Sequence, residues 1–185
     1  YATSTLFVAV VIYLMMLWNE KADEPGHERY LMLIAYLIGL STGVHLLAVL
    51  TVFSIALVVY FRKYDVNFKS FMFMGIIALV IFFFIYPIIV KWLPAFLAGH
   101  TSGRNEAYEY TIDESFGLQL LAILSIVGAI VGLVWGYKNN KQLVTLVAGS
   151  FLLIILGYTT YTQILLRSNA NPPMNENEPK TFSKL

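Results

Sequence analysis

The chain has 185 residues, of which 58% are hydrophobic and only 12% charged, and its mean hydropathy is +0.71. A soluble domain has about 25% charged residues, so this composition is typical of an integral membrane protein. The formal net charge of +1 excludes a strong attraction to nucleic acid, and the absence of cysteine excludes disulfides, thiolate metal sites and cysteine nucleophiles.

The first predicted span runs from Tyr1 to Trp18. At ~1.5 Å per residue this helix is ~27 Å long, close to the ~30 Å hydrocarbon core of a membrane. Aromatic residues stand at both of its ends, where they anchor a span in the membrane interface. The apolar run begins at once, without a positively charged leader. We therefore expect the chain to be an internal or processed piece of a longer protein.

The next apolar run, Tyr30 to Phe61, contains no Asp, Glu, Lys or Arg. As one helix it would be ~48 Å long, too long for a comfortable span. Its middle reads GLSTGVH and collects residues that form helices poorly. This pattern predicts a short hairpin of two antiparallel helices, 30–44 and 46–61, with the turn within Gly39 to His45. The backbone of such a turn must be buried in protein or face a water-filled cavity.

Three further spans are predicted, at 70–90, 116–137 and 142–166. Pro87 near the end of the first of these predicts a kink or a break. A longer exposed connection, 91–115, follows it, and the aromatic and apolar start of this connection is expected to lie in the membrane interface. Gly128 and Gly132 form a GxxxG pair, which predicts close helix packing.

These elements predict an all-α fold, a polytopic transmembrane helix bundle of about six spans over residues 1–168. An Asn/Pro-rich segment, 169–185, follows the last span. Such a composition cannot bury a core of its own. We expect it to form an extended external tail that leads into further C-terminal sequence.

The orientation follows from the basic residues, which are concentrated in cytoplasmic loops. Seven lie in the loops on one side of the predicted bundle: Lys21, Arg29, Arg62, Lys63, Lys69, Lys138 and Lys141. The other side has Lys91, Arg104 and Arg167. We therefore expect the first group of loops to be cytoplasmic. Both chain ends, the 91–115 connection and the turn at His45 are then external.

His45 is the sharpest functional candidate, because an ionisable residue inside a span is a functional candidate by default. Near an aqueous cavity it can bind a phosphate oxygen, relay a proton or ligate a metal. Alternatively, a neutral imidazole hydrogen-bonds a neighbouring helix or the hydroxyls of Ser41 and Thr42. His27 lies on the opposite side of the membrane and His100 is alone in a loop, so we expect no metal and no cofactor.

Two other groups of polar residues allow two interpretations each. Four carboxylates in the 91–115 connection are either acid–base catalysts or part of a solvated acidic loop: Glu106, Glu109, Asp113 and Glu114. Arg167 stands where the last span leaves the membrane. It pairs either with lipid phosphates as a general anchor or with the phosphate of a specific substrate.

Two segments carry a resemblance to a known family. The pattern GLS-G-HLL matches Gly39 to Leu47, and the pattern GYS-Y…IRS-ANPP…N-P matches Gly157 to Pro179. Thr159 stands where Ser is usual, and Leu166 where Ile is usual. In these motifs the chain resembles a large bacterial multi-spanning family that is catalogued chiefly as a domain of unknown function and described as protein O-mannosyltransferase-like.

This resemblance implies a relation to C-type glycosyltransferases, which transfer a sugar from a polyprenyl-phosphate carrier on the outer face of the membrane. In that class a catalytic Asp or Glu lies in the first outer loop, and a "DxGE"-like motif of this kind is absent from the chain. The fragment is therefore expected to lack the general base, and its catalytic residues stay unknown. The candidates for binding the donor phosphate are His45, Ser41, Thr42 and Arg167.

The resulting interpretation is part of an integral membrane glycosyltransferase in the bacterial inner membrane, with both ends of this segment periplasmic. Its expected partners are membrane lipid, a polyprenyl-phosphate sugar and a protein Ser/Thr acceptor, with no nucleic acid. The alternative is a membrane transporter or a non-catalytic membrane scaffold. A transporter also needs a broken helix and a polar group in the membrane, but no paired repeat supplies a second break here.

Overall fold

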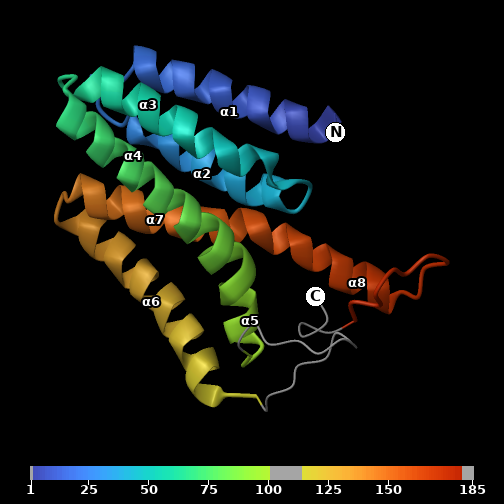
Figure 1. Cartoon of the computed structure of the whole chain (residues 1–185). Coiled ribbons are helices and arrows are strands. Elements are labelled where there is room, and N and C mark those ends of the chain that lie inside the picture. The colour runs from blue at the N-terminus through green and yellow to red at the C-terminus, as the bar shows by residue number, and fades with distance from the viewer. Residues whose placement is uncertain (1, 101–113, 181–185) are drawn as a thin grey trace.

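The computed structural model describes residues 2–100 and 114–180, and within these ranges the chain is helical and has no strand (Figure 1). The all-α prediction is confirmed. The α-helices are α1 (Ala2–Glu20), α2 (Glu28–Thr42), α3 (Thr51–Lys63), α4 (Phe68–Phe83), α5 (Leu93–Leu97), α6 (Phe116–Lys138), α7 (Gln142–Tyr158) and α8 (Gln163–Asn169). They are connected in part by 3₁₀ turns, η1 (Leu46–Leu50) and η3 (Thr159–Thr162), and by a π-helix, η2 (Phe84–Trp92).

Five continuous helical stretches of the described chain are long and apolar enough to cross a membrane: Ala2–Glu20, Leu46–Lys63, Phe68–Leu97, Phe116–Lys138 and Gln142–Asn169. The sixth predicted span corresponds to α2, which has 15 residues. At ~1.5 Å per residue α2 is ~23 Å long, which is short of the hydrocarbon thickness. Most of its residues are buried or half-buried.

The predicted hairpin is present. Helix α2 ends at Thr42, and His45 has an extended backbone, with φ −167° and ψ 140°. The 3₁₀ turn η1 then leads into α3, which runs back toward the end of the bundle from which α2 started (Figure 1). One continuous helix over residues 30–61 is therefore excluded, as the length argument required.

Of the two outcomes predicted for Pro87, a kink or a break, the structure has the kink. Helix α4 continues through the π-helix η2, with Pro87 inside it, and then through α5, so that one bent helical arm extends from Phe68 to Leu97 (Figure 1). Proline lacks the N–H that an α-helix needs at this point, and the wider π turn accommodates that loss without ending the helix. The arm therefore takes up the first part of the predicted 91–115 connection; Gly99 and His100 after it are buried, and residues 101–113 lie outside the described residues.

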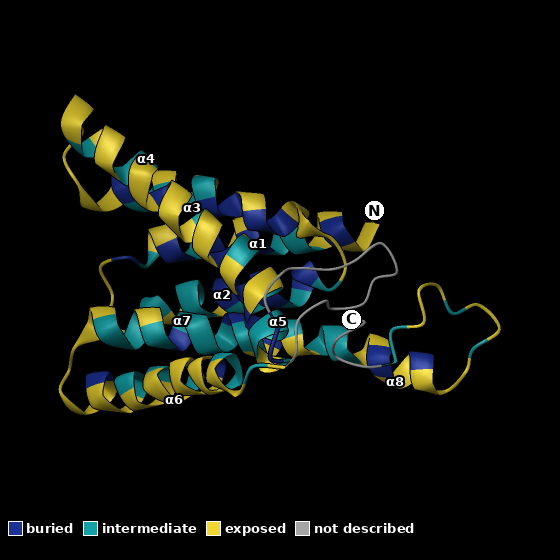
Figure 2. Ribbon diagram, turned by 60° about the horizontal axis from the view of Figure 1, so that its bottom comes forward, coloured by how far each residue is buried: buried dark blue, intermediate teal, exposed yellow. Residues whose placement is uncertain are grey.

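The GxxxG prediction is only partly right. A Cβ placed on Gly128 meets nothing within 4 Å, and one on Gly132 lies 3.8 Å from the Cβ of Ala148. The close contact between α6 and α7 is one turn later, where a Cβ on Gly136 would lie 2.8 Å from Oγ1 of Thr145. The outer face of α6 is exposed along most of its length (Figure 2), as expected of a helix that faces lipid.

The core surrounds α2. Ile34, Ala35 and Ile38 of α2 are buried together with apolar residues from α1, η1, α3, the helical arm and α7: Val11, Leu14, Met15, Val49, Val52, Ile85, Ile89 and Ile154. The α1–α2, α3–α4 and α6–α7 loops lie at one end of the bundle, and the α2–α3 turn, the N-terminus and α8 lie at the other (Figure 1). We call these the loop end and the turn end.

Residues 170–180 contain no helix and fold back on the end of α8. The side-chain amide of Asn169 donates a hydrogen bond to the Lys180 carbonyl at 3.1 Å, and the Lys180 ammonium donates to Oδ1 of Asn171 at 2.8 Å. Asn171 has a φ of 49°, in the left-handed region that asparagine tolerates better than most residues. These contacts close the segment into a loop at the turn end.

Candidate functional site

The two segments that carry the family resemblance meet in the structure. Their first residues, Gly39 of α2 and Gly157 of α7, lie where these helices cross. A Cβ on Gly39 would lie 2.1 Å from the carbonyl oxygen of Ile154, and one on Gly157 would lie 2.4 Å from that of Tyr36. Only glycine allows backbones to approach so closely. The crossing therefore depends on both glycines.

An open cavity of about 390 Å³ lies next to this crossing, at the turn end of the bundle. We call it the Arg167 groove. Helix α1, the α2–α3 turn and the helical segment after α7 form its walls. Its lining residues are Thr3, Phe7, Leu40, Gly43, Val44, Thr160, Tyr161, Gln163, Ile164 and Arg167. Among the described residues, Arg167 is the only charged side chain in this lining.

The groove is thus polar along one wall and apolar along another. Gln163 and Arg167 bring an amide and a guanidinium from α8, and Thr160 of η3 lines the same wall with its hydroxyl donating to the Gly157 carbonyl at 2.8 Å. Leu40 and Val44 bring apolar surface from α2 and the turn. Such an arrangement suits an amphiphile with an anionic head, because guanidinium pairs with phosphate through two parallel hydrogen bonds.

Ser41 and Thr42 are buried beside the groove and do not line it. The Ser41 hydroxyl donates to the Ile38 carbonyl at 2.8 Å, and the Thr42 hydroxyl donates to the Gly39 carbonyl at 2.6 Å. Both hydrogens are therefore directed into their own helix. Donating to a ligand would require each side chain to change rotamer. Phosphate binding by this pair stays a prediction.

His45 faces a different cavity from Arg167. Its Nδ1 accepts a hydrogen bond from the backbone N–H of Leu47 at 3.1 Å and so caps η1. Because Nδ1 accepts, the proton of the neutral ring is on Nε2, which is then its donor. The second cavity, of about 250 Å³, is almost entirely apolar and is lined by His45, Leu46, Leu47, Val49, Leu50, Phe82 and Tyr86.

The structure thus brings Arg167 next to the turn but places His45 on another side of it. Within residues 2–100 and 114–180, no group of three or more His, Asp or Glu side chains is arranged to hold a metal ion. Of the four carboxylates in the predicted 91–115 connection, Glu106, Glu109 and Asp113 lie outside the described residues, and Glu114 is exposed.

Residues 1–68 match the family model described as the Protein O-mannosyl-transferase TMEM260 N-terminal domain. The N-terminal part of the chain is protein O-mannosyltransferase-like. This match includes the α2–α3 turn with Gly39 and His45 but ends before the residues of α7 and α8. No curated protein and no solved structure matches the chain.

Two tyrosines that lie outside the matched residues belong to the site but were missed by sequence reasoning. Tyr161 lines the Arg167 groove, and its ring stacks on that of Tyr158, with centroids 5.6 Å apart and an angle of 14° between the planes. The Tyr158 hydroxyl donates to the Val90 carbonyl at 3.1 Å. The sequence held one signal for this contact, because the α-helical donor to that carbonyl would be residue 94, which is a proline.

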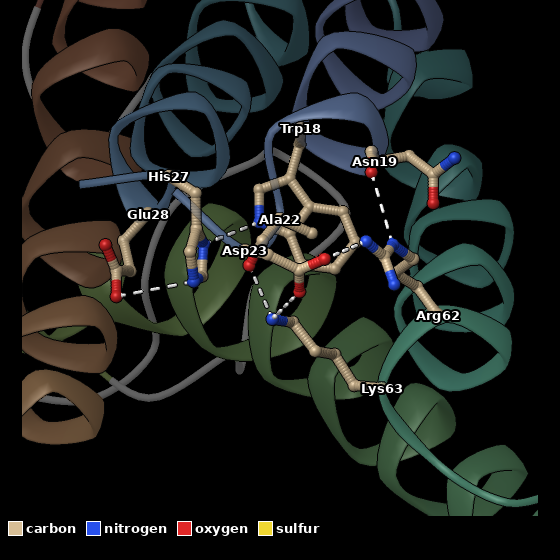
Figure 3. Close-up of polar contacts among 8 residues, drawn as sticks. All are labelled: Trp18, Asn19, Ala22, Asp23, His27, Glu28, Arg62 and Lys63. Carbon is tan, nitrogen blue, oxygen red and sulfur yellow. Dashed lines mark hydrogen bonds and ion pairs between the residues drawn. The ribbon is translucent and has the colours of Figure 1, made fainter. Parts of the chain in front are cut away.

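A polar cluster at the loop end, residues 18–28 with Arg62 and Lys63, was also missed (Figure 3). The Arg62 guanidinium forms an ion pair with Asp23 and donates to the Asn19 carbonyl at 3.3 Å. Lys63 donates to the Ala22 carbonyl at 2.5 Å and lies 3.6 Å from the Asp23 carboxylate. These contacts hold the α1–α2 loop against the end of α3.

The electrostatics of this cluster follow from the Asp23–Arg62 pair. The hydrogen bond from Arg62 holds the pKa of the exposed Asp23 carboxyl below its ordinary value of 3.8. On the other side of the loop, the Trp18 indole N–H donates to Nδ1 of His27 at 3.1 Å, and Nε2 of that ring lies 3.7 Å from Glu28 (Figure 3). We interpret the cluster as a structural clamp and not as part of the groove, because it lies at the opposite end of the bundle.

Proposed function

We propose that the intact protein is a membrane glycosyltransferase that transfers a sugar from a polyprenyl-phosphate donor to an acceptor, with a protein Ser/Thr hydroxyl as the candidate acceptor. The family match supports a relation to protein O-mannosyltransferases. The observation that carries the proposal is the Arg167 groove, with a single cation among hydroxyl, amide and apolar groups. Membrane lipid, the donor and a protein acceptor are its proposed partners.

The groove fits a lipid-phosphate donor for a physical reason. Such a donor has an apolar chain that stays in the membrane and a phosphate that stays near the interface. Arg167 is exposed and lies near the end of the last helical stretch, Gln142–Asn169. A guanidinium there attracts phosphate more strongly than it would in bulk water, because the surroundings have a lower dielectric constant.

The proposed reaction is a displacement at the anomeric carbon. The acceptor oxygen forms a bond to that carbon, and the bond between the carbon and the phosphate oxygen breaks. The acceptor proton passes to an acidic residue that we place elsewhere in the intact protein. Arg167 stabilises the charge that develops on the departing phosphate, and His45, Ser41 and Thr42 remain further candidates for this role.

The proposed location is the outer face of a bacterial inner membrane, with the turn end external. In this orientation the seven basic residues of the loop end are cytoplasmic, in agreement with the usual charge distribution of membrane proteins. The Arg167 groove then opens on the side where C-type glycosyltransferases act.

The test compares Arg167→Ala, Arg167→Lys and wild type in the intact protein. The assay uses radiolabelled polyprenyl-phosphate mannose and a Ser/Thr-containing peptide in detergent. We expect Arg167→Ala to reduce the transfer rate about 100-fold, the usual loss when a preorganised hydrogen-bond donor is removed from an active site. Arg167→Lys should recover only part of the rate, because an ammonium cannot form the paired hydrogen bonds of a guanidinium.

Arg29→Ala is the matched control, since it removes an exposed arginine at the loop end, and its rate should stay at the wild-type level. Equal loss in the two alanine variants would contradict a specific role for Arg167. If the wild type transfers no sugar but exchanges labelled solute across proteoliposomes, the transporter alternative is correct. If it does neither, the scaffold alternative is favoured.

A further inference from the structure

The Arg167 groove is connected to the helical arm Phe68–Leu97 by a chain of two contacts. Tyr161, in the groove wall, stacks on Tyr158, and the Tyr158 hydroxyl donates to the Val90 carbonyl in the arm. We infer that Tyr158 is a positioning residue, which holds the Tyr161 ring in the groove wall and fixes the arm against it. Occupancy of the groove and the position of the arm are then linked.

The hydrogen bond is formed between the two prolines of the arm. Pro87 lies inside the π-helix η2, and Pro94 follows in α5. Val90 belongs to η2, and its carbonyl accepts a hydrogen bond from the Tyr158 hydroxyl of another helix, while Pro94, four residues on, has no N–H for an α-helical bond to it. π-Helical segments of this kind tolerate bending and are frequent at functional sites.

The other end of the connection is rigid. Tyr158 directly follows Gly157, whose Cα faces the α2 backbone so closely that an added Cβ would lie 2.5 Å from the Leu40 nitrogen. The backbone beneath Tyr158 therefore cannot shift without separating α2 from α7. A movement of the Tyr161 ring is consequently transmitted through the stack to the phenol of Tyr158, and from there to the arm.

The stack also restricts the groove. One face of the Tyr161 ring is covered by Tyr158, and its Cδ2 atom would lie 3.8 Å from a Cβ on Gly43 of the turn. A ligand in the groove therefore meets a ring that has one face already covered by Tyr158. Only the identity of that ligand, a lipid phosphate, rests on the proposed function.

The experiment measures the distance between the arm and the groove in the full chain. Single cysteines replace Leu97 in α5 and Leu166 in α8, both exposed, and the chain has no cysteine of its own. Nitroxide labels on the pair report the distance distribution by pulsed electron paramagnetic resonance in nanodiscs. The variant Tyr158→Phe keeps the ring stack and removes only the hydroxyl. Tyr137→Phe, an exposed tyrosine of α6, is the control.

Without ligand, Tyr158→Phe should raise the population of a displaced arm by about 2- to 10-fold, the factor given by loss of one hydrogen bond. Tyr137→Phe should match the unsubstituted pair. A distribution in Tyr158→Phe that is the same as in the control would overturn the inference. This ligand-free measurement decides whether Tyr158 positions the arm even if the proposed function is wrong.

A second measurement adds polyprenyl phosphate, and binding of this lipid is measured separately by retention of radiolabelled lipid on the nanodiscs. The distance distribution should shift on binding in the unsubstituted pair and shift less in Tyr158→Phe, with the lipid still bound. Bound lipid with an equal shift in both proteins contradicts the link. Absence of binding contradicts the proposed function alone, and the ligand-free measurement then remains the test of Tyr158.

Discussion

The crossing of α2 and α7 gives the sharpest test of the packing argument. In Gly39→Ala the new Cβ would lie 2.1 Å from the Ile154 carbonyl oxygen and 2.8 Å from two further backbone atoms of that residue. Contacts of a Cβ below 3.0 Å are essentially never observed, so the carbonyl must retreat by about 1 Å. Because the obstacle is backbone, no side chain can rotate away. The two helices must separate.

Overpacking of this kind costs about 1–3 kcal/mol. For a chain of this size such a loss lowers the melting temperature by roughly 5 °C. The assay is thermal unfolding in detergent, followed by intrinsic fluorescence of the three tryptophans. Gly157→Ala should behave in the same way, since its Cβ would lie 2.4 Å from the Tyr36 carbonyl oxygen and 2.5 Å from the Leu40 nitrogen.

Gly75→Ala and Gly128→Ala are matched controls, because both glycines are helical and an added Cβ meets nothing within 4 Å at either site. Alanine favours a helix over glycine by up to about 1 kcal/mol, so these variants should be neutral or slightly more stable. If Gly39→Ala melts at the temperature of the two controls, α2 and α7 do not cross as closely as described. The close crossing beside the Arg167 groove is then refuted.

Three further predictions concern the two ends of the bundle. The pKa of Asp23 is lowered by Arg62, so the contribution of their ion pair is present above the unfolded pKa of about 3.9 and is lost as pH falls through the folded value. Asp23→Asn should therefore flatten the fall in melting temperature between pH 5 and pH 3, and an unchanged slope would show that the pair adds nothing. An impermeant maleimide should label a cysteine at Met174 from outside the cell but not one at Asn139, and the reverse result would invert the proposed orientation. His45→Ala removes the side chain that caps η1, whereas His45→Asn keeps a hydrogen-bond acceptor there. The alanine variant should therefore have the lower melting temperature, and equal melting temperatures would exclude this capping role.

The number and location of the helices could largely be predicted, because length and hydropathy decide which segments can cross a membrane. The hairpin followed from the mismatch between residues 30–61 and the thickness of the hydrocarbon. Its turn was correctly placed because glycine, serine and threonine are weak helix formers. At Pro87 the sequence left a kink and a break open, and the structure has a kink, because a helix can absorb a proline by widening into a π turn; no single residue in the sequence distinguishes the two outcomes.

The candidate site was less accessible to sequence reasoning. Arg167 was singled out from its place at the end of a span, and the structure puts it in a groove beside the turn. His45 was singled out because it is ionisable, but it lies in a different cavity from Arg167. The contact of Gly39 with α7 could not be predicted, since the two helices are distant in sequence and glycine carries no side chain that indicates a partner.

The spacing within the two motifs accounts for the position of the groove. In each motif a glycine at the α2–α7 crossing is followed four residues later by a residue that lines the groove: Gly39 by Gly43, and Gly157 by Tyr161. Residues three or four apart in 3₁₀- or α-helical backbone lie about one turn apart. The glycines therefore bring the two helices together, and the next turn of each lies at the edge of the space that opens beyond the contact. The width of the groove depends on how closely the crossing is packed. A substitution at either glycine should for this reason alter binding in the groove as well as stability, even though neither glycine contributes a side chain to it.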